Sequence, residues 1–264
     1  MMLSTYHCHT TYCDGKNTPR EMIEAAIAAG CKEIGFSGHA YMTMNDSFWM
    51  SREGTLDYFS ELTELKRIYE NKIRVYIGIE QDYFSEPISL PYDYVIGSVH
   101  YVEKNGNFLA VDRDLETTRA NIENHYAGDA DAYAEDYFAL VGRIYEKTHC
   151  NIVGHFDLIT KFEEKESLLC ESSTRYTNAA MRALSQLINA PTFFEINTGA
   201  ISRGHRTTPY PSRSICDILH KTGKPFVINS DAHSAANVIA GIAEAEAMCQ
   251  QCGYPYIRSF SEIL

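Results

Sequence analysis

The sequence predicts an α/β protein whose parallel sheet is closed, or nearly closed, into a barrel. Seven short β-rich runs, at 3–9, 33–39, 73–79, 94–99, 151–155, 192–197 and 225–233, are separated mostly by helical segments. Repeated strand–helix units favour a parallel sheet, and seven such units at this length favour a barrel over an open doubly wound sheet. The sequence has no glycine-rich phosphate loop, which weakens a nucleotide-binding alternative.

The helices between these runs are indicated by apolar periodicity and by their end signals. Thr18, Pro19 and Glu21 form a helix start, and Gly30 ends the helix expected over 21–29. Further helices are expected at 56–71, 133–145, 173–189, 212–221 and 237–252. We expect loops at 41–54 and 198–211, and a loop followed by a helix at 103–129.

Length and composition limit the classes of protein that fit. The 264 residues fit one domain spanning 1–264, and the formal net charge of −12 disfavours nucleic acid as a partner. No apolar stretch is long enough for a membrane span, and no secretory signal is visible, so we expect a cytoplasmic protein with reduced thiols. The pair Cys249 and Cys252 is interpreted as two buried helix thiols rather than as half of a zinc or redox motif.

Metal-type ligands follow nearly every predicted strand. His7 and His9 are two residues apart on a strand, so both imidazoles face the same way. Such groups recur at the carboxyl ends of the other strands, where a βα barrel collects its catalytic groups. The predicted metal ligands are His7, His9, Asp14, His39, Glu80, His100, His155, Asp231 and His233. This many polar groups at one rim need partners, and bound metals supply them.

The number of ligands indicates two or three divalent ions, because zinc prefers four ligands. Mixed imidazole and carboxylate ligands suit Zn, Mn or Fe without choosing between them. Ions a few ångströms apart generate a hydroxide near neutral pH and clamp phosphoryl oxygens, so the expected chemistry is hydrolysis.

Cations beside the predicted rim point to a phosphate monoester as the small-molecule substrate. Arg203 and His205 lie in the loop after the 192–197 strand, and Lys161 follows His155 by a few residues. A guanidinium grips phosphate oxygens through two hydrogen bonds, and an ammonium adds a point charge. Arg113 is interpreted as a loop charge that can reach the site.

Several motifs resemble those of the polymerase and histidinol phosphatase (PHP) family. They include His7-x-His9, Gly-Ser-Val-His100 and Ser-Asp231-Ala-His233, together with Phe-Ser-Gly-His39, Gly-Ile-Glu80 and Val-Gly-His155-Phe-Asp. The segment around Trp49 and the Tyr-Pro-Ser block at 210–212 are similar to the histidinol-phosphatase branch. The resemblance implies a distorted (β/α)7 barrel, like a TIM barrel, with a trinuclear metal site.

The resemblance also implies residue roles. The first metal would be held by His7, His9, Glu80 and Asp231, the second by Glu80, His100 and His155, and the third by Asp14, His39 and His233. The implied reaction is hydrolysis of L-histidinol phosphate to L-histidinol and phosphate, in histidine biosynthesis, by a metal-bridging hydroxide. Arg203 matches the family's phosphate-binding position, and Asp231 or His233 would manage protons.

Three alternatives remain open from the sequence. A phosphoesterase of the same fold can act on phosphotyrosine or on a nucleotide. A metal-dependent amidohydrolase also opens with His-x-His, but it normally has a lysine at a middle strand end, where this chain has Glu80. A non-catalytic metal-binding module is disfavoured, because the ligand set is complete and no polymerase segment is present. The oligomeric state is left open.

Overall fold

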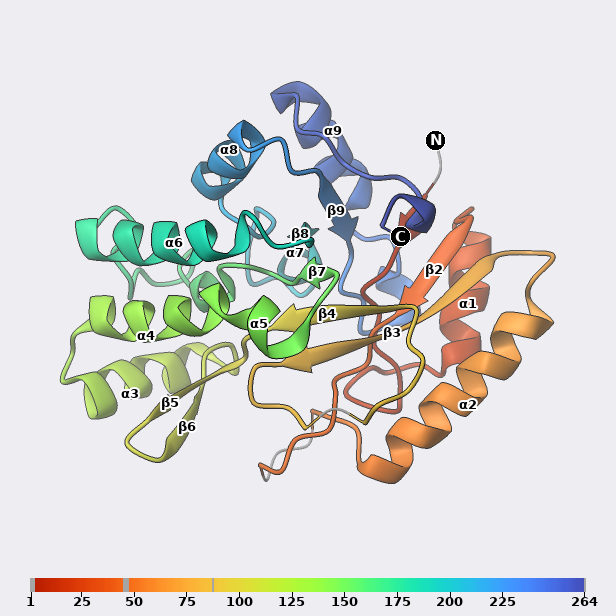
Figure 1. Cartoon of the computed structure of the whole chain (residues 1–264), viewed down its shortest axis with the longest axis horizontal. Helices are drawn as coiled ribbons and strands as arrows, with labels where there is room; N and C mark the ends of the chain where they lie inside the picture. The colour runs from red at the N-terminus through yellow and green to blue at the C-terminus, as the bar shows by residue number, and fades with distance from the viewer. Residues whose placement is uncertain (1–2, 45–47, 87, 264) are drawn as a thin grey trace.

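The structure is a computed structural model that describes residues 3–44, 48–86 and 88–263 (Figure 1). Within this part of the chain, seven strands form one sheet in the order β1-β2-β3-β4-β7-β8-β9, and every neighbouring pair is parallel. The strands are β1 (Ser4–Thr5), β2 (Glu33–Phe36), β3 (Arg74–Asp82), β4 (Tyr94–Ser98), β7 (Ile152–Val153), β8 (Phe193–Asn197) and β9 (Phe226–Asn229). They fall within or overlap the seven predicted runs, which confirms the predicted α/β barrel.

The first and last strands of the sheet meet mainly beyond their carboxyl ends. There the His9 amide donates to the Ala232 carbonyl at 2.9 Å, and the Ala232 amide donates to the His7 carbonyl at 3.1 Å. Closer to the strands, a side chain makes the connection, since Asn229 Oδ1 at the end of β9 accepts from the Tyr6 amide at 2.7 Å. The barrel is therefore nearly closed, and its backbone seam lies beside both His-containing motifs.

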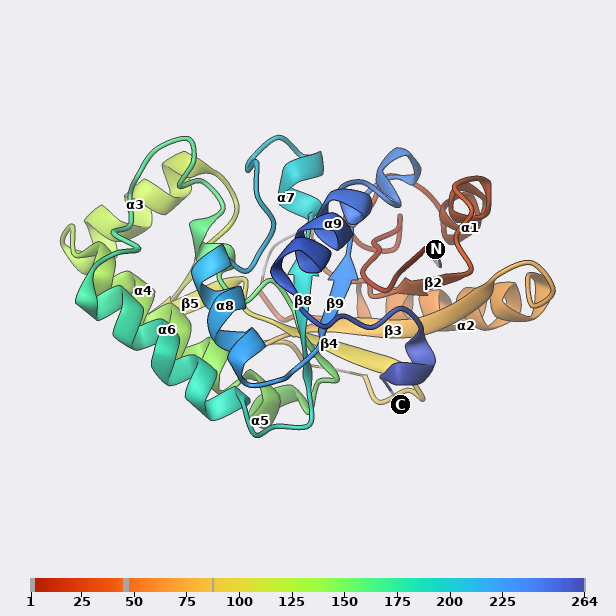
Figure 2. The same cartoon turned by 90° about the horizontal axis from the view of Figure 1, so that it is seen from above.

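Helices cover the outside of the sheet. They are α1 (Pro19–Ala28), α2 (Arg52–Ile68), α3 (Leu115–Tyr126), α4 (Ala130–Gly142), α5 (Ile144–Thr148), α6 (Thr174–Leu187), α7 (Gly199–Ser202), α8 (Arg213–Lys221) and α9 (Ile242–Cys252). Helices α1 and α2 lie beside β2 and β3, whereas α3, α4 and α6 stack together on the other side (Figures 1 and 2). The predicted start of α1 is confirmed, because Thr18 and Glu21 form a reciprocal capping box.

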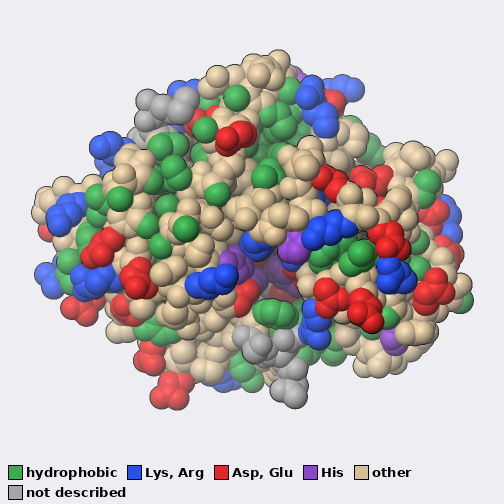
Figure 3. Space-filling model, turned by 180° about the vertical axis from the view of Figure 1, so that it is seen from behind, with side chains coloured by type: hydrophobic (Ala, Val, Ile, Leu, Met, Phe, Trp, Pro, Cys, Tyr) green, Lys and Arg blue, Asp and Glu red, His purple; other side chains and the backbone are tan. Residues whose placement is uncertain are grey.

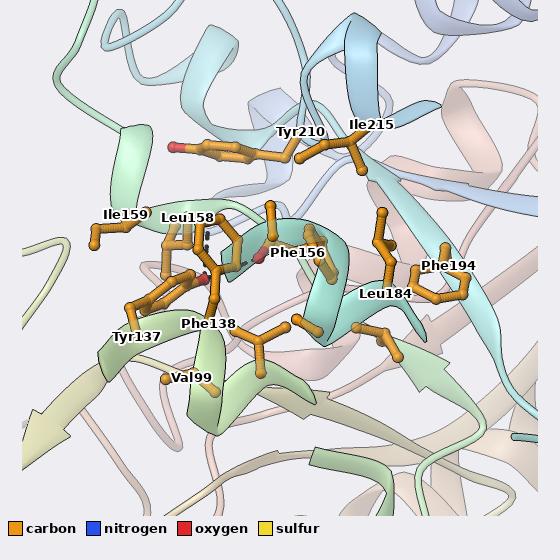
Figure 4. Close-up of a cluster of buried hydrophobic side chains, with 14 of the residues drawn as sticks. Val99, Tyr137, Phe138, Phe156, Leu158, Ile159, Leu184, Phe194, Tyr210 and Ile215 are labelled. Carbon is orange, nitrogen blue, oxygen red and sulfur yellow. Dashed lines mark hydrogen bonds between the residues drawn. The ribbon is translucent and has the colours of Figure 1, made fainter. Parts of the chain in front are cut away.

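Buried clusters hold these layers together, and three of them join helices or the C-terminal segment to the sheet. In the largest, Phe138 of α4 and Leu184 of α6 pack towards Phe194 of β8 (Figure 4). A second lies between α1, α2 and the outer face of β2 and β3. The third includes Tyr6, Tyr94 and Phe260, so the C-terminal segment packs against the barrel strands.

Several predicted boundaries are wrong for identifiable local reasons. Part of the expected 103–129 loop is a hairpin of β5 (Tyr101–Lys104) and β6 (Asn107–Ala110), joined by Asn105 and Gly106, which both have positive φ. Asn-Gly favours this turn, so the signal was present. Helix α2 begins inside the expected 41–54 loop, because Ser51 accepts from the Gly54 amide. Residues 45–47 of that loop lie outside the described residues.

The later helices also depart from their expected bounds. The 133–145 helix is divided at Arg143 into α4 and α5, and the 198–211 loop contains the short helix α7. The last helix begins at Ile242 instead of residue 237, because Gly241 has a φ of 77°.

The structure also describes the state of the cysteine thiols and the length and apolar character of the helices. All eight cysteines carry free thiols, with Cys249 buried and Cys252 half-buried in α9. Among the described residues, none of the helices combines the length and the apolar character needed to cross a membrane.

Candidate metal centre

The nine predicted metal ligands converge at the carboxyl end of the barrel. Seven of them line one cavity, namely Asp14, His39, Glu80, His100, His155, Asp231 and His233. His7 and His9 lie beneath it and are almost completely buried. In Figure 3, histidine side chains are visible in a hollow with lysine or arginine side chains at its edge.

The strand geometry of the opening motif places both imidazoles on the same side. The ring centroids of His7 and His9 are 5.1 Å apart, whereas Cys8 between them is buried against the α1 and α2 cluster. Residues 230–233 cross the same seam, and Asp231 has a φ of 48°, in the left-handed region. Aspartate tolerates this conformation better than most residues. His9 Nε2 then lies 3.2 Å from Asp231 Oδ1.

Glu80 lies at the centre of the cluster. Its Oε2 is 2.9 Å from His39 Nδ1 and 3.3 Å from His7 Nε2. Its Oε1 is 3.1 Å from His155 Nε2 and 3.5 Å from His100 Nε2. His9 Nε2 lies 3.6 Å from Oε2 as well, and five imidazoles around one carboxylate form a geometry in which both oxygens can serve as metal ligands.

Ligand atoms of the nine residues form four overlapping groups. They are His9, Asp14, His39 and His233; His7, Glu80 and His155; His7, His9 and Asp231; and His39, Glu80 and His100. Within each group the ligand atoms lie within 4.8 Å of one another. Because the groups share members, the cluster can hold more than one ion.

Unpartnered polar atoms test whether the cluster fits metals. Within the described residues, His7 Nε2, His9 Nε2 and Asp14 Oδ1 are buried without a hydrogen-bond partner. Burying such atoms unpaired is costly, and native structures rarely leave several of them together. The donors are imidazole and carboxylate groups, which divalent metals accept, so the residues fit metal ions.

Charge within the cluster perturbs several pKa values. Burial opposes ionisation of Glu80 and Asp231, but the surrounding histidines and Arg203 outweigh it and hold both pKa values well below their usual range. Burial and the neighbouring His233 and His39 lower the pKa of His9 to about 3. His9 is therefore neutral at pH 7, the form in which an imidazole binds a metal.

Glu195 is a functional residue to which sequence reasoning assigned no role. Its Oε1 lies 2.7 Å from His7 Nδ1, and its Oε2 accepts from the His155 amide at 2.9 Å. Since a carboxylate accepts, His7 Nδ1 carries a proton, and Nε2 is the ring nitrogen that faces the cluster and would bind a metal. The available signal was a carboxylate within the otherwise largely apolar strand β8.

Asp82 supports His100 in the same way. Its Oδ2 accepts from the His100 amide at 2.7 Å and lies 3.2 Å from His100 Nδ1. A carboxylate behind a histidine ligand fixes its ring orientation and raises its basicity.

Arg203 and Lys161 line the cavity, but His205 is not among its lining residues. Arg203 donates to the Asp231 carbonyl and to Asp231 Oδ2, each at 3.0 Å, and its buried Nε has no described partner. Gly199 permits this approach, because a Cβ there would lie 2.6 Å from Asp231 Oδ2. His205 instead contacts Lys165 Nζ at 3.1 Å and the Phe162 ring.

The cavity is also lined by described residues on either side of residues 45–47 and by residues after β4. Its outer lining includes Met42, Phe48, Trp49, Tyr101, Arg113 and Leu158. The Trp49 and Tyr101 rings meet edge to face with their centroids 6.1 Å apart. The site is thus polar at its base and partly aromatic at its mouth.

Comparison with known proteins identifies the family. The sequence model of the PHP domain matches residues 5–199. The chain belongs to the PHP family.

Three curated relatives of this PHP protein carry histidinol-phosphatase names. A "probable histidinol-phosphatase" of Deinococcus radiodurans is 28% identical over 90% of this chain and 89% of that protein. The histidinol-phosphatase of Lactococcus lactis is 24% identical over 97% of this chain and 93% of its own length. A "probable histidinol-phosphatase" of Schizosaccharomyces pombe is 25% identical over 88% of this chain and 80% of that protein.

Solved structures share the fold of this PHP protein. A putative histidinol phosphatase from Listeria monocytogenes superposes with a TM-score of 0.79 at 21% identity, covering 92% of this chain and 99% of that one. A second structure is that of histidinol phosphate phosphatase from Lactococcus lactis, complexed with zinc, L-histidinol and phosphate. It superposes with a TM-score of 0.73 at 20% identity, covering 96% of this chain and 95% of that one. These likenesses confirm the distorted barrel of the PHP family.

Proposed function

We propose that this PHP protein is a metal-dependent phosphatase that hydrolyses L-histidinol phosphate to L-histidinol and phosphate. The observation that carries the proposal is that nine metal-type ligands and two cations, Arg203 and Lys161, converge on one cavity. The three curated relatives, at 24–28% identity, support the choice of substrate. The Lactococcus lactis structure, which holds L-histidinol and phosphate, also supports it.

The proposed metal ligands are the nine residues of the cluster. We assign His7, His9, Glu80 and Asp231 to the first ion, Glu80, His100 and His155 to the second, and Asp14, His39 and His233 to the third. The overlapping groups of ligand atoms are compatible with two or three ions. Zinc in the Lactococcus lactis structure favours zinc, and the ligand types also suit Mn and Fe. When bound, such ions supply a nucleophilic oxygen at neutral pH and positive charge for the phosphoryl oxygens.

The protein's own cations would bind and orient the phosphate. Arg203 Nε is a buried donor without a described partner, and its two other nitrogens are fixed on Asp231. A guanidinium has five N–H donors and the Arg203 side chain is 25% exposed, so donors that Asp231 does not engage can bind a phosphoryl oxygen. Lys161 Nζ supplies a second positive charge at the same cavity.

Asp231 and His233 are the proposed groups for proton handling. Asp231 contacts both His9 and Arg203, and His233 Nε2 lies 3.2 Å from Asp14 Oδ2. The departing alkoxide needs a proton, and these residues lie beside the cations that would hold the phosphate. His205 is outside the proposed site, because it does not line the cavity.

Phosphate release after chelation and restoration of Zn, Mn or Fe tests the proposal. L-histidinol phosphate should show a metal-dependent kcat/KM at least about a hundredfold above phosphotyrosine and nucleoside monophosphates, roughly 2.7 kcal/mol of discrimination. Equal, slow release across the panel would reject L-histidinol phosphate as the substrate and favour another phosphoesterase of this family.

A further inference from the structure

One acidic side chain that lines the cavity pairs with a lysine and not with a histidine of the metal-ligand cluster. Five acidic residues line the cavity, namely Asp14, Glu80, Asp82, Asp112 and Asp231. Asp14, Glu80 and Asp231 contact histidines of the cluster, and Asp82 supports His100. The ion-pair partner of Asp112 is instead Lys161. A cationic ligand can therefore approach Asp112 without displacing a metal ligand.

Lys161 fixes Asp112 at the wall of the cavity. Its Nζ donates to Asp112 Oδ2 at 2.9 Å and to the Asp112 carbonyl at 2.8 Å. The Lys161 side chain is 10% exposed and that of Asp112 is 26% exposed, so the carboxylate is the more accessible member of the pair. The site thus presents a positive and a negative charge side by side.

Such a pair is complementary to a substrate that carries both charges close together. If a phosphate binds at Lys161, its ester chain begins beside the Asp112 carboxylate, because Lys161 Nζ and Asp112 Oδ2 are 2.9 Å apart. An ammonium on the second carbon would meet the Asp112 carboxylate, while the phosphate keeps the lysine. A larger group on that carbon would face the outer wall, which includes Phe48, Trp49 and Tyr101.

We propose that Asp112 is the ammonium-binding residue of this site and selects 2-aminoalkyl phosphate monoesters over phosphates with uncharged chains. This inference rests on the proposed function, since L-histidinol phosphate is a member of that class. It adds a residue that accounts for specificity, separate from the groups that hold metals or phosphate. Asp112 acts on binding, because a charge pair at a partly buried site discriminates against a partner that lacks the charge.

Two small substrates of similar size isolate the ammonium. In 2-aminoethyl phosphate and propyl phosphate, an ammonium and a methyl group occupy corresponding positions. The wild-type, metal-loaded protein should prefer 2-aminoethyl phosphate by about tenfold or more in kcat/KM. Asp112→Asn should reduce this preference to near unity, chiefly through a higher KM for the amine. Comparing the two ratios cancels the difference in intrinsic reactivity.

Asp136→Asn is the matched control, because Asp136 also binds a lysine, Lys104, at 2.6 Å and does not line the cavity. It should keep the wild-type preference. Equal losses with both substrates in Asp112→Asn would overturn the inference and leave Asp112 as a support for Lys161. A wild-type protein without preference for the amine would overturn it even if Asp112→Asn failed to fold.

The failure of the proposed function would look different. Absence of phosphate release from L-histidinol phosphate under every metal condition would reject the enzyme assignment and this inference with it. Rapid hydrolysis of L-histidinol phosphate combined with no preference for 2-aminoethyl phosphate would reject the inference alone.

Discussion

Replacing Glu195 by glutamine should weaken metal binding although Glu195 touches no proposed metal position itself. Four donors converge on its carboxylate. Oε1 accepts from His7 Nδ1 and from Asn229 Nδ2, at 2.7 and 2.9 Å. Oε2 accepts from the His155 amide and from Asn197 Nδ2, both at 2.9 Å. A glutamine has only one acceptor oxygen, so its amide group must face two of these donors.

The expected magnitude follows from those contacts. Two buried donors lose a charged acceptor, at about 1.5–3 kcal/mol each, so the free energy of unfolding should fall by roughly 3–6 kcal/mol. If the amide faces His7, the ring is driven to the tautomer that protonates Nε2, and that nitrogen cannot bind a metal. Loss of such a support typically costs about 10–100-fold in metal affinity.

Metal titration in a chelator-buffered solution, with bound metal counted by mass spectrometry, measures this effect independently of activity. Glu33→Gln is the matched control. Glu33 is also fully buried and accepts from four donors, which belong to Tyr6, Arg74, Ser259 and Phe260. The Glu33→Gln substitution should lower the free energy of unfolding and leave the metal affinity unchanged. If Glu195→Gln binds metals as tightly as the wild type, the positioning role of Glu195 is refuted.

Three further predictions concern the metals, the phosphate and the pH. Chelation should lower the midpoint of thermal unfolding. Restoring metal at about a hundredfold its Kd should raise the free energy of unfolding by about 2.7 kcal/mol and the midpoint by roughly 5–10 °C. Identical melting curves with and without metal would contradict the metal centre. Arg203→Lys should reduce kcat/KM for phosphate release about 10–100-fold, because a single ammonium cannot both bind Asp231 as Arg203 does and offer a donor to phosphate; unchanged kinetics would count against the assignment. Burial raises the pKa of Glu163 from 4.5 to about 7, so its contribution to stability is present below pH 4.5 and is lost as the pH rises through 7. Glu163→Gln should therefore gain stability relative to the wild type from about pH 5 to pH 8, measured by urea unfolding, and a gain that does not change with pH would contradict this reasoning.

Some local features could be predicted because their signals lie within a few residues. The capping box of Thr18 and Glu21 and the same-side placement of His7 and His9 follow from helix and strand periodicity. The β5–β6 hairpin was also available from Asn105-Gly106, but the polarity of the surrounding residues favoured a loop. That error concerned the choice between two local signals and did not affect the barrel.

Contacts between distant segments could not be predicted in the same way. Lys161 was interpreted as a phosphate-binding charge, and the structure shows that it also fixes Asp112, which is far away in the sequence. His205 has the right type and position for the site, yet its ring lies against Phe162 and Lys165 and not in the cavity. The direction of a loop side chain depends on its packing neighbours, which periodicity does not specify.

The sequence by itself determined the parallel barrel and the edge at which its ligands gather. Strand ends are set by local apolar runs, and in a parallel barrel all carboxyl ends share one rim. Only the tertiary structure decided how these ligands are grouped and supported. The central position of Glu80, the contact of Glu195 with His7 and the pairing of Asp112 with Lys161 each join residues from separate strands or loops. Such contacts depend on the stagger of neighbouring strands and on the closure of the sheet, which local apolar patterns do not specify.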